Sequence, residues 1–160
     1  MSEVSKKEVS NRKYKNNTLS IVLSIIFLLL SIIHVYWAFG GTWGFNNVLP
    51  ETSEGVKILN PTFTDSIIVG FGLLLFSTIY LFYAKLFKVK VLIFLRAILL
   101  WLIPSIFLLR AIGDFHIVGF FKHIRNTNFA YFDNYFYSPL CLFIAVMGFI
   151  VAKRKVTISK

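Results

Sequence analysis

The sequence predicts an all-α membrane protein, a polytopic bundle of four transmembrane helices with a polar outer loop and an amphipathic segment lying in the outer interface. Four apolar segments fill more than half of the 160-residue chain. Each is about long enough to cross a hydrocarbon core of about 30 Å at a rise of about 1.5 Å per residue. Hydrophobic residues make up 57% of the chain and charged residues only 15%, whereas soluble domains carry about 25% charged residues.

The predicted membrane domain takes in residues 18–152. Its four spans cover approximately residues 19–39, 63–84, 91–112 and 135–152. The first apolar run is too long for the central region of a signal peptide, so we expect it to be retained as a span. Residues 1–17 form a basic arm that we expect to be disordered or to lie on the membrane surface, and residues 153–160 form a basic tail.

The distribution of charge predicts the orientation. Most of the 17 Lys and Arg residues precede the first span, join the second and third spans, or follow the fourth. The positive-inside rule then places both termini in the cytoplasm of a multi-pass cell-membrane protein. The net charge of +10 is spread over span ends and not gathered in one patch, which predicts membrane lipids as partners and excludes nucleic acid.

Glycine and tryptophan mark the outer end of the first span. Gly40–Gly41 are expected to stop the helix, because glycine reaches positive φ at little cost. Trp37 and Trp43 lie at the depth of an aromatic belt. The few residues at 85–90 predict a tight cytoplasmic hairpin, so that the second and third helices are antiparallel neighbours.

Two features mark the second half of the chain. Pro104 lies near the middle of the third span and is expected to kink it. Residues 113–134 are aromatic and basic, and their apolar residues alternate with Lys122, His123 and Arg125. This alternation is typical of a short amphipathic segment in the outer interface.

Residues capable of acid–base chemistry gather on the outer side. Ionisable residues within a membrane are costly, so they are candidates for function. The candidate outer-face cluster consists of His34, Tyr36, Trp37, Trp43, Asp65, Arg110, Asp114 and Asp133. We find no metal, nucleotide or nucleophile motif, so no cofactor or metal is expected.

Each ionisable residue of the cluster has a structural and a functional interpretation. His34 is either hydrogen-bonded to a neighbouring helix or part of a ligand or proton site. Arg110 and Asp114 are four residues apart and can pair on a helix, which predicts a cluster with His34 where the first and third helices meet. Asp65 and Asp133 precede or begin helices, where a carboxylate caps the end or pairs with the helix dipole.

The single cysteine, Cys141, excludes an intramolecular disulfide. It therefore excludes membrane thiol oxidoreductases, whose chemistry needs a cysteine pair. We expect Cys141 to be an apolar helix residue without redox activity.

Two sequence strings resemble signatures of a known family. Residues 34–44 read HVYWAFGGTWG, and residues 109–122 run from LRAIGDF to GFFK, with further matches at Phe129-Ala130 and at 137–141, YSPLC. This pattern is similar to that of the small bacterial membrane proteins catalogued as domain of unknown function 3995. The resemblance covers roughly residues 20–150 and implies four helices, bacterial origin and no established activity.

Three functions fit these observations. The first is binding or processing of a lipid or small hydrophobic molecule at the outer leaflet. The second is a non-enzymatic accessory, immunity or envelope-stress role, with a homo-oligomer or an unknown membrane partner. The third is a small proton-coupled exporter, which ranks last because no Asp or Glu lies near a helix centre.

Overall fold

The structure is a computed structural model that describes the backbone of residues 3–84 and 93–158. Within these ranges every regular element is a helix, and the only strand-like pairing is an isolated bridge between Glu51 and Lys57. The elements are α1 (Glu3–Ala38), α2 (Phe45–Val48), α3 (Phe63–Tyr83), α4 (Ile93–Ile112), α5 (Asn128–Phe132), the π-helix η1 (Asp133–Tyr137) and α6 (Ser138–Ile158).

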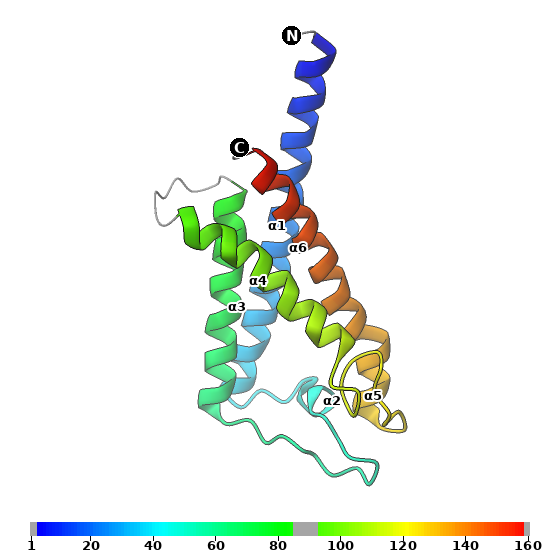
Figure 1. Cartoon of the computed structure of the whole chain (residues 1–160). Coiled ribbons are helices and arrows are strands. Elements are labelled where there is room, and N and C mark those ends of the chain that lie inside the picture. Colours follow the sequence, from blue (N-terminus) through cyan, green and yellow to red (C-terminus); the bar gives the residue numbers. More distant parts are fainter. Residues whose placement is uncertain (1–2, 85–92, 159–160) are drawn as a thin grey trace.

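The long helices pack as two pairs, α1 with α3 and α4 with α6, and α1 also contacts α6. Figure 1 shows that α2, α5 and the long loops gather at one end of the bundle, while the first turns of α1 and the last turns of α6 lie at the other end. The two pairs diverge toward the loop end.

Three helical stretches are long and apolar enough to cross a membrane: Thr18–Ala38, Phe63–Tyr83 and Asn128–Arg154. In the described part of α4, the apolar stretch Ile98–Ile112 is shorter. These helices are compatible with a helical membrane bundle. The predicted cytoplasmic hairpin at 85–90 lies outside the described residues.

The basic arm differs from its prediction. Instead of a disordered or surface-lying segment, α1 begins at Glu3 and continues without a break into the apolar span. Residues 3–17 contain no proline or glycine. Extending a helix that is already formed adds one hydrogen bond for each residue fixed, so the arm continues the helix of the span.

Small residues hold α1 against α3. The hydroxyl groups of Ser24 and Ser77 lie 2.8 Å apart, and each also donates to the backbone carbonyl of the other residue at 2.9 Å. Two turns further along the same face of α1, the Ser31 hydroxyl donates to the Gly70 carbonyl at 2.7 Å. Interhelical bonds between small residues are typical of membrane helices, whose backbones approach closely at such positions.

The core joins the two helix pairs through one aromatic cluster. The Phe27 ring of α1 lies with its centroid 5.6 Å from that of Phe76, 5.7 Å from that of Tyr80 and 5.2 Å from that of Phe107. Because Phe76 and Tyr80 belong to α3 and Phe107 to α4, this single buried ring links three helices.

Glycine ends α1 as predicted. Gly40 has a φ of 86°, its N–H donates to the Trp37 carbonyl at 3.0 Å, and the Gly41 N–H donates to the Tyr36 carbonyl at 3.0 Å. These two bonds form a Schellman motif, which requires the left-handed conformation that glycine adopts readily. A side chain at Gly41 would also overlap the Tyr36 ring.

Candidate functional site

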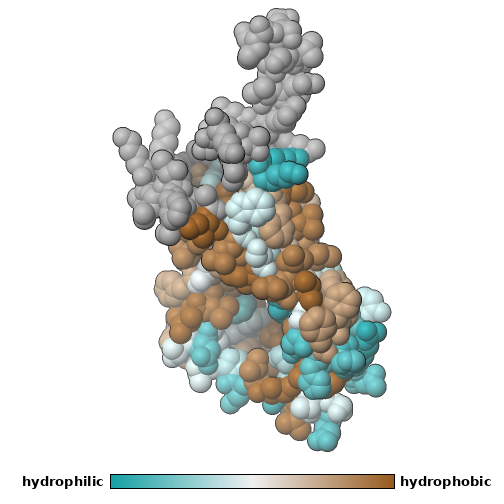
Figure 2. Space-filling model, in the orientation of Figure 1, coloured by the Kyte–Doolittle hydropathy of each residue, from teal (hydrophilic) through white to brown (hydrophobic). Residues whose placement is uncertain are grey.

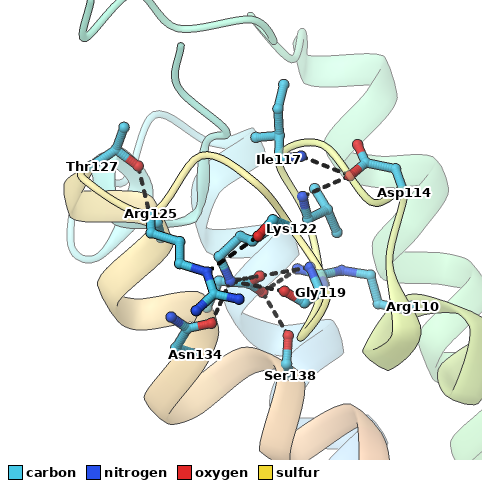
Figure 3. A network of polar contacts seen from close by, with 12 residues as sticks. Arg110, Asp114, Ile117, Gly119, Lys122, Arg125, Thr127, Asn134 and Ser138 are labelled. Carbon is cyan, nitrogen blue, oxygen red and sulfur yellow. Dashed lines mark hydrogen bonds and ion pairs between the residues drawn. The ribbon is translucent and has the colours of Figure 1, made fainter. Parts of the chain in front are cut away.

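Asp133 is the centre of a buried polar network at the loop end of the bundle, and Figure 3 shows the residues of this network. Its side chain is fully buried at the start of η1. Oδ1 accepts hydrogen bonds from Arg110 Nη2 at 2.8 Å and from Ser138 Oγ at 3.1 Å. Oδ2 accepts from the Gly119 N–H and from Lys122 Nζ, both at 2.8 Å. Four donors therefore satisfy the carboxylate, and none of its oxygens is left to act as a base.

Lys122 is the second buried charge, and its side chain is 0% exposed. Its ammonium group donates to the Gly119 carbonyl at 2.9 Å, to Asp133 Oδ2 at 2.8 Å and to Asn134 Oδ1 at 2.6 Å. An ammonium group has three donors, so all of them are used. Lys122 thus fixes the loop to η1. Its alternation with apolar residues had predicted a place on the polar face of an interfacial segment, and this prediction was wrong for Lys122.

Two glycines let this loop fold back over α4. Gly113 has a φ of 93° and Gly119 a φ of 89°. A Cβ atom on Gly113 would overlap the Val118 carbonyl, and one on Gly119 would overlap the backbone at residues 112–113. The Phe120 N–H donates to the Ala111 carbonyl at 2.9 Å. This close backbone contact brings the Gly119 N–H and Lys122 onto Asp133.

Asp114 organises the same loop through its own backbone contacts. Its Oδ1 accepts from the N–H groups of His116 at 2.8 Å, Ile117 at 2.7 Å and Val118 at 2.9 Å. Partial burial raises the pKa of this carboxyl, but the backbone donors outweigh that effect and hold the pKa below its usual value.

Arg110 bonds to Asp133, which differs from the predicted pair with Asp114. The pairing at a spacing of four residues requires a helix through both positions, but α4 ends at Ile112 and Gly113 turns the chain away. The Arg110 side chain is 32% exposed. Its Nη1 atom is buried and has no hydrogen-bond partner among the described residues.

His34 stands apart from this network. Its Nδ1 lies 2.8 Å from the Leu30 carbonyl of its own helix. A carbonyl can only accept, so Nδ1 carries the proton, and in the neutral ring Nε2 is then an acceptor. The ring packs on Trp37 at a centroid distance of 5.0 Å. Within the described part of the chain, no hydrogen bond joins His34 to Arg110 or Asp114, so the predicted three-residue cluster does not form.

The other residues of the first motif make local contacts. Trp37 Nε1 donates to the Trp43 carbonyl at 2.9 Å, and the Trp43 N–H donates to the Tyr36 hydroxyl at 3.4 Å. These two bonds therefore hold the chain at Trp43 against the last turn of α1. Asp65 lies at the start of α3, where it forms a capping box with Thr62, which is the helix-start role considered for it.

His34 and Arg110 lie on the loop-end side of the contact between α1 and α4. Phe27 of α1 contacts Phe107 of α4. His34 follows Phe27 by two helical turns and packs beside Gly70 of α3, and Arg110 follows Phe107 by nearly one turn. Figure 2 shows the surface hollowed between the two helix pairs in the lower half of this view, toward the loop end. We call this hollow the recess.

The described residues contain no group of three or more His, Cys, Asp or Glu side chains placed to hold a metal ion. Cys141 is a free, partly buried thiol in α6.

The comparisons with known proteins give one match. A family model described as "Protein of unknown function (DUF3995)" matches residues 27–148, well over half of the chain. The matched region includes the Asp133 network and His34. No curated protein and no solved structure matches the chain.

Proposed function

The chain belongs to the DUF3995 family of proteins of unknown function, and we propose that it is a four-span membrane protein that binds a lipid or small hydrophobic molecule in the recess on the outer side. In this proposal both termini lie in the cytoplasm of a multi-pass protein of the cell membrane, and α4 is the third span.

The charge pattern and the fold both support this topology. The basic arm and the basic tail flank the first and last spans, as the positive-inside rule requires for cytoplasmic ends. The beginning of α1 and the end of α6 lie at the same end of the bundle (Figure 1). The acids Glu51, Asp65, Asp114 and Asp133 belong to the loop end, which becomes the outer side.

The observation that carries the binding role is the presence of two ionisable residues, His34 and Arg110, on helices of the two different pairs toward the loop end, where Figure 2 shows the recess. Toward the loop end from the Phe27–Phe107 contact, α1 carries His34 and α4 carries Arg110. Polar groups at such positions are costly unless they have partners. A bound molecule with an apolar body and a polar head would match this recess.

The contacts favour binding over catalysis. Asp133 and Lys122 are saturated by protein groups, and Asp114 accepts from three backbone donors. A general base must keep an oxygen or nitrogen free for the proton that it removes. Within the described residues, His34 Nε2 and Asp114 Oδ2 keep such a free atom, and Asp114 lies on the exposed loop.

A second candidate, an accessory role with a protein partner, is supported by a different surface. Val56, Ile58 and Leu59 are exposed in the loop before α3. Exposed apolar side chains in an extramembrane loop mark contact sites when they are contiguous. This role leaves the recess without a use, so we rank it second.

Lipid mass spectrometry of the protein purified in mild detergent tests the binding role. We expect one molecular species to be enriched over the bulk membrane extract. The change His34→Leu should reduce its occupancy with little change in thermal stability, because His34 bonds only to its own helix. The matched control is His116→Leu on the exposed loop. An extract identical to bulk lipid, or equal occupancy in His34→Leu and wild type, would reject the proposal.

A further inference from the structure

The loop end of the bundle carries more positive than negative charge around Asp133. Lys122 and Asp133 neutralise each other in the buried interior. Arg110 shares the same carboxylate through one nitrogen only. Arg125 is exposed, and its Nε donates to the Lys122 carbonyl at 3.3 Å, which holds a third cation next to the network. Two cations thus bond to the Asp133 carboxylate, and Arg125 adds a third positive charge next to Lys122.

Arg110 has a donor that the protein does not satisfy. Nη1 is buried and has no acceptor within the described part of the chain, whereas Nη2 is 2.8 Å from Asp133. A buried charged donor without a partner is costly and rare in proteins. The guanidinium is also fixed by its bond to Asp133, so little side-chain entropy would be lost when a second acceptor binds.

The position of Arg110 relative to the membrane indicates which anion would be available to bind it. Arg110 lies in the last turn of α4, and the segments that follow α4 carry exposed aromatic residues such as Phe115, Phe121 and Tyr135. Exposed aromatic rings are typical of the head-group level of a bilayer. Phosphate is the anion that every phospholipid presents at this level, and guanidinium groups bind it with charge-assisted hydrogen bonds.

We infer that Arg110 binds the phosphate of a phospholipid head group, with Arg125 adding to the positive field, while the lipid chains occupy the recess. This inference rests on the proposed lipid-binding function and assigns the ligand class. Figure 3 shows the Arg110 and Arg125 side chains reaching toward the network from opposite sides. The Lys122–Asp133 pair serves as the rigid support that positions Arg110.

The test measures binding of defined ligands to the purified, delipidated full chain by native mass spectrometry. The ligands are short-chain phosphatidylglycerol, diacylglycerol of the same chain length, and inorganic phosphate. We expect phosphatidylglycerol to bind at least about tenfold more tightly than diacylglycerol, as one well-formed charge-assisted contact would give. Arg110→Gln should remove this preference and Arg125→Gln should reduce it, whereas Lys57→Gln, on an exposed outer-loop residue, should leave it unchanged.

The outcomes separate the two proposals. Arg125→Gln changes an exposed side chain and should fold normally, so it tests the inference even if Arg110→Gln is unstable. Equal binding of phosphatidylglycerol and diacylglycerol, insensitive to both arginine variants, would overturn the phosphate site and leave lipid binding intact. Binding of neither lipid would overturn both proposals. Inorganic phosphate that binds alone with lipid-like affinity would confirm the anion site but overturn its assignment to a head group.

Discussion

A single buried carboxylate determines how the loop end of this protein folds. Asp133 accepts bonds from α4, from the loop after it, and from the start of α6. A buried ion pair such as Lys122–Asp133 adds little to the stability of the fold compared with an apolar core of the same volume. Removing one partner, however, is strongly destabilising, because the other charge is left buried and unpaired. The network is therefore best regarded as a structural anchor that holds Arg110 in place.

The change Asp133→Asn should destabilise the protein by about 3–5 kcal/mol, because it leaves Lys122 charged, buried and without its counter-ion. Chemical or thermal unfolding in detergent would measure this loss. The matched control is Asp65→Asn, which changes an exposed capping residue and should cost about 1 kcal/mol. Equal losses in the two variants would contradict the anchor role.

Asp114 should make the order of its loop dependent on pH. A carboxyl whose pKa is lowered in the folded state adds stability above its unfolded pKa of about 4, and this stability is lost as the pH falls through the lower, folded value. The protection of the amides of residues 116–118 against hydrogen exchange, relative to their intrinsic rate at each pH, should therefore fall only below about pH 4. Asp114→Asn should show low protection at every pH, and protection equal to that of the wild type at neutral pH in that variant would refute this role.

Among single residues, the sequence singled out several that make polar contacts in the structure, but it predicted few of their partners. His34, Arg110, Asp114 and Asp133 were recognised because ionisable residues at membrane depth are rare. Lys122 was missed because a lysine alternating with apolar residues has the pattern of a surface. Only the fold-back at Gly113 and Gly119 buries it, and the spacing of these glycines was the available signal.

At the scale of elements, close backbone contact decides how helices pair. In α6, a Cβ atom on Gly148 would lie 2.8 Å from Pro104 Cβ of α4 and 2.9 Å from the Tyr80 hydroxyl of α3. Gly148 thus lets three helices meet at one point. Pro104, which lacks the backbone N–H that would donate within α4, is buried against Gly148.

The change Gly148→Ala should destabilise the bundle by about 1–3 kcal/mol through overpacking. Gly72→Ala in α3 is the matched control, because a Cβ atom there meets nothing within 4 Å. It should be neutral or slightly stabilising, since alanine favours helix more than glycine does. Thermal unfolding of the two variants side by side measures the difference, and a loss as large in Gly72→Ala as in Gly148→Ala would show that space at Gly148 is not the cause.

Element positions followed from the sequence more readily than contacts did. The apolar runs and Gly40–Gly41 predicted the helices and the end of α1, since both depend on local chemistry. The serines that join α1 to α3 gave no such signal, because a serine in an apolar helix has the same appearance whether it faces lipid or a partner. The helical basic arm was missed because its composition has no apolar period, although nothing in it stops a helix.

For the whole molecule, we expect the two termini to lie on the cytoplasmic side of the membrane and the loop end on the outer side. A reporter that is active only outside the cell should be silent when fused after Lys160 and active when inserted near Ser53, in the loop before α3. Most basic residues flank the ends assigned to the cytoplasm. Activity after Lys160 combined with silence at Ser53 would reverse the orientation and place the recess on the inner side.

We propose that the recess holds a lipid whose head group contacts Arg110. An experimental structure of the full chain in lipid nanodiscs tests it most directly. We expect lipid density between the α1–α3 and α4–α6 pairs, with a phosphate oxygen within about 2.7–3.2 Å of Arg110 Nη1, while Asp133 keeps its four donors. A recess closed by side chains, or lipid only on the outer perimeter with Arg110 turned away, would contradict the account.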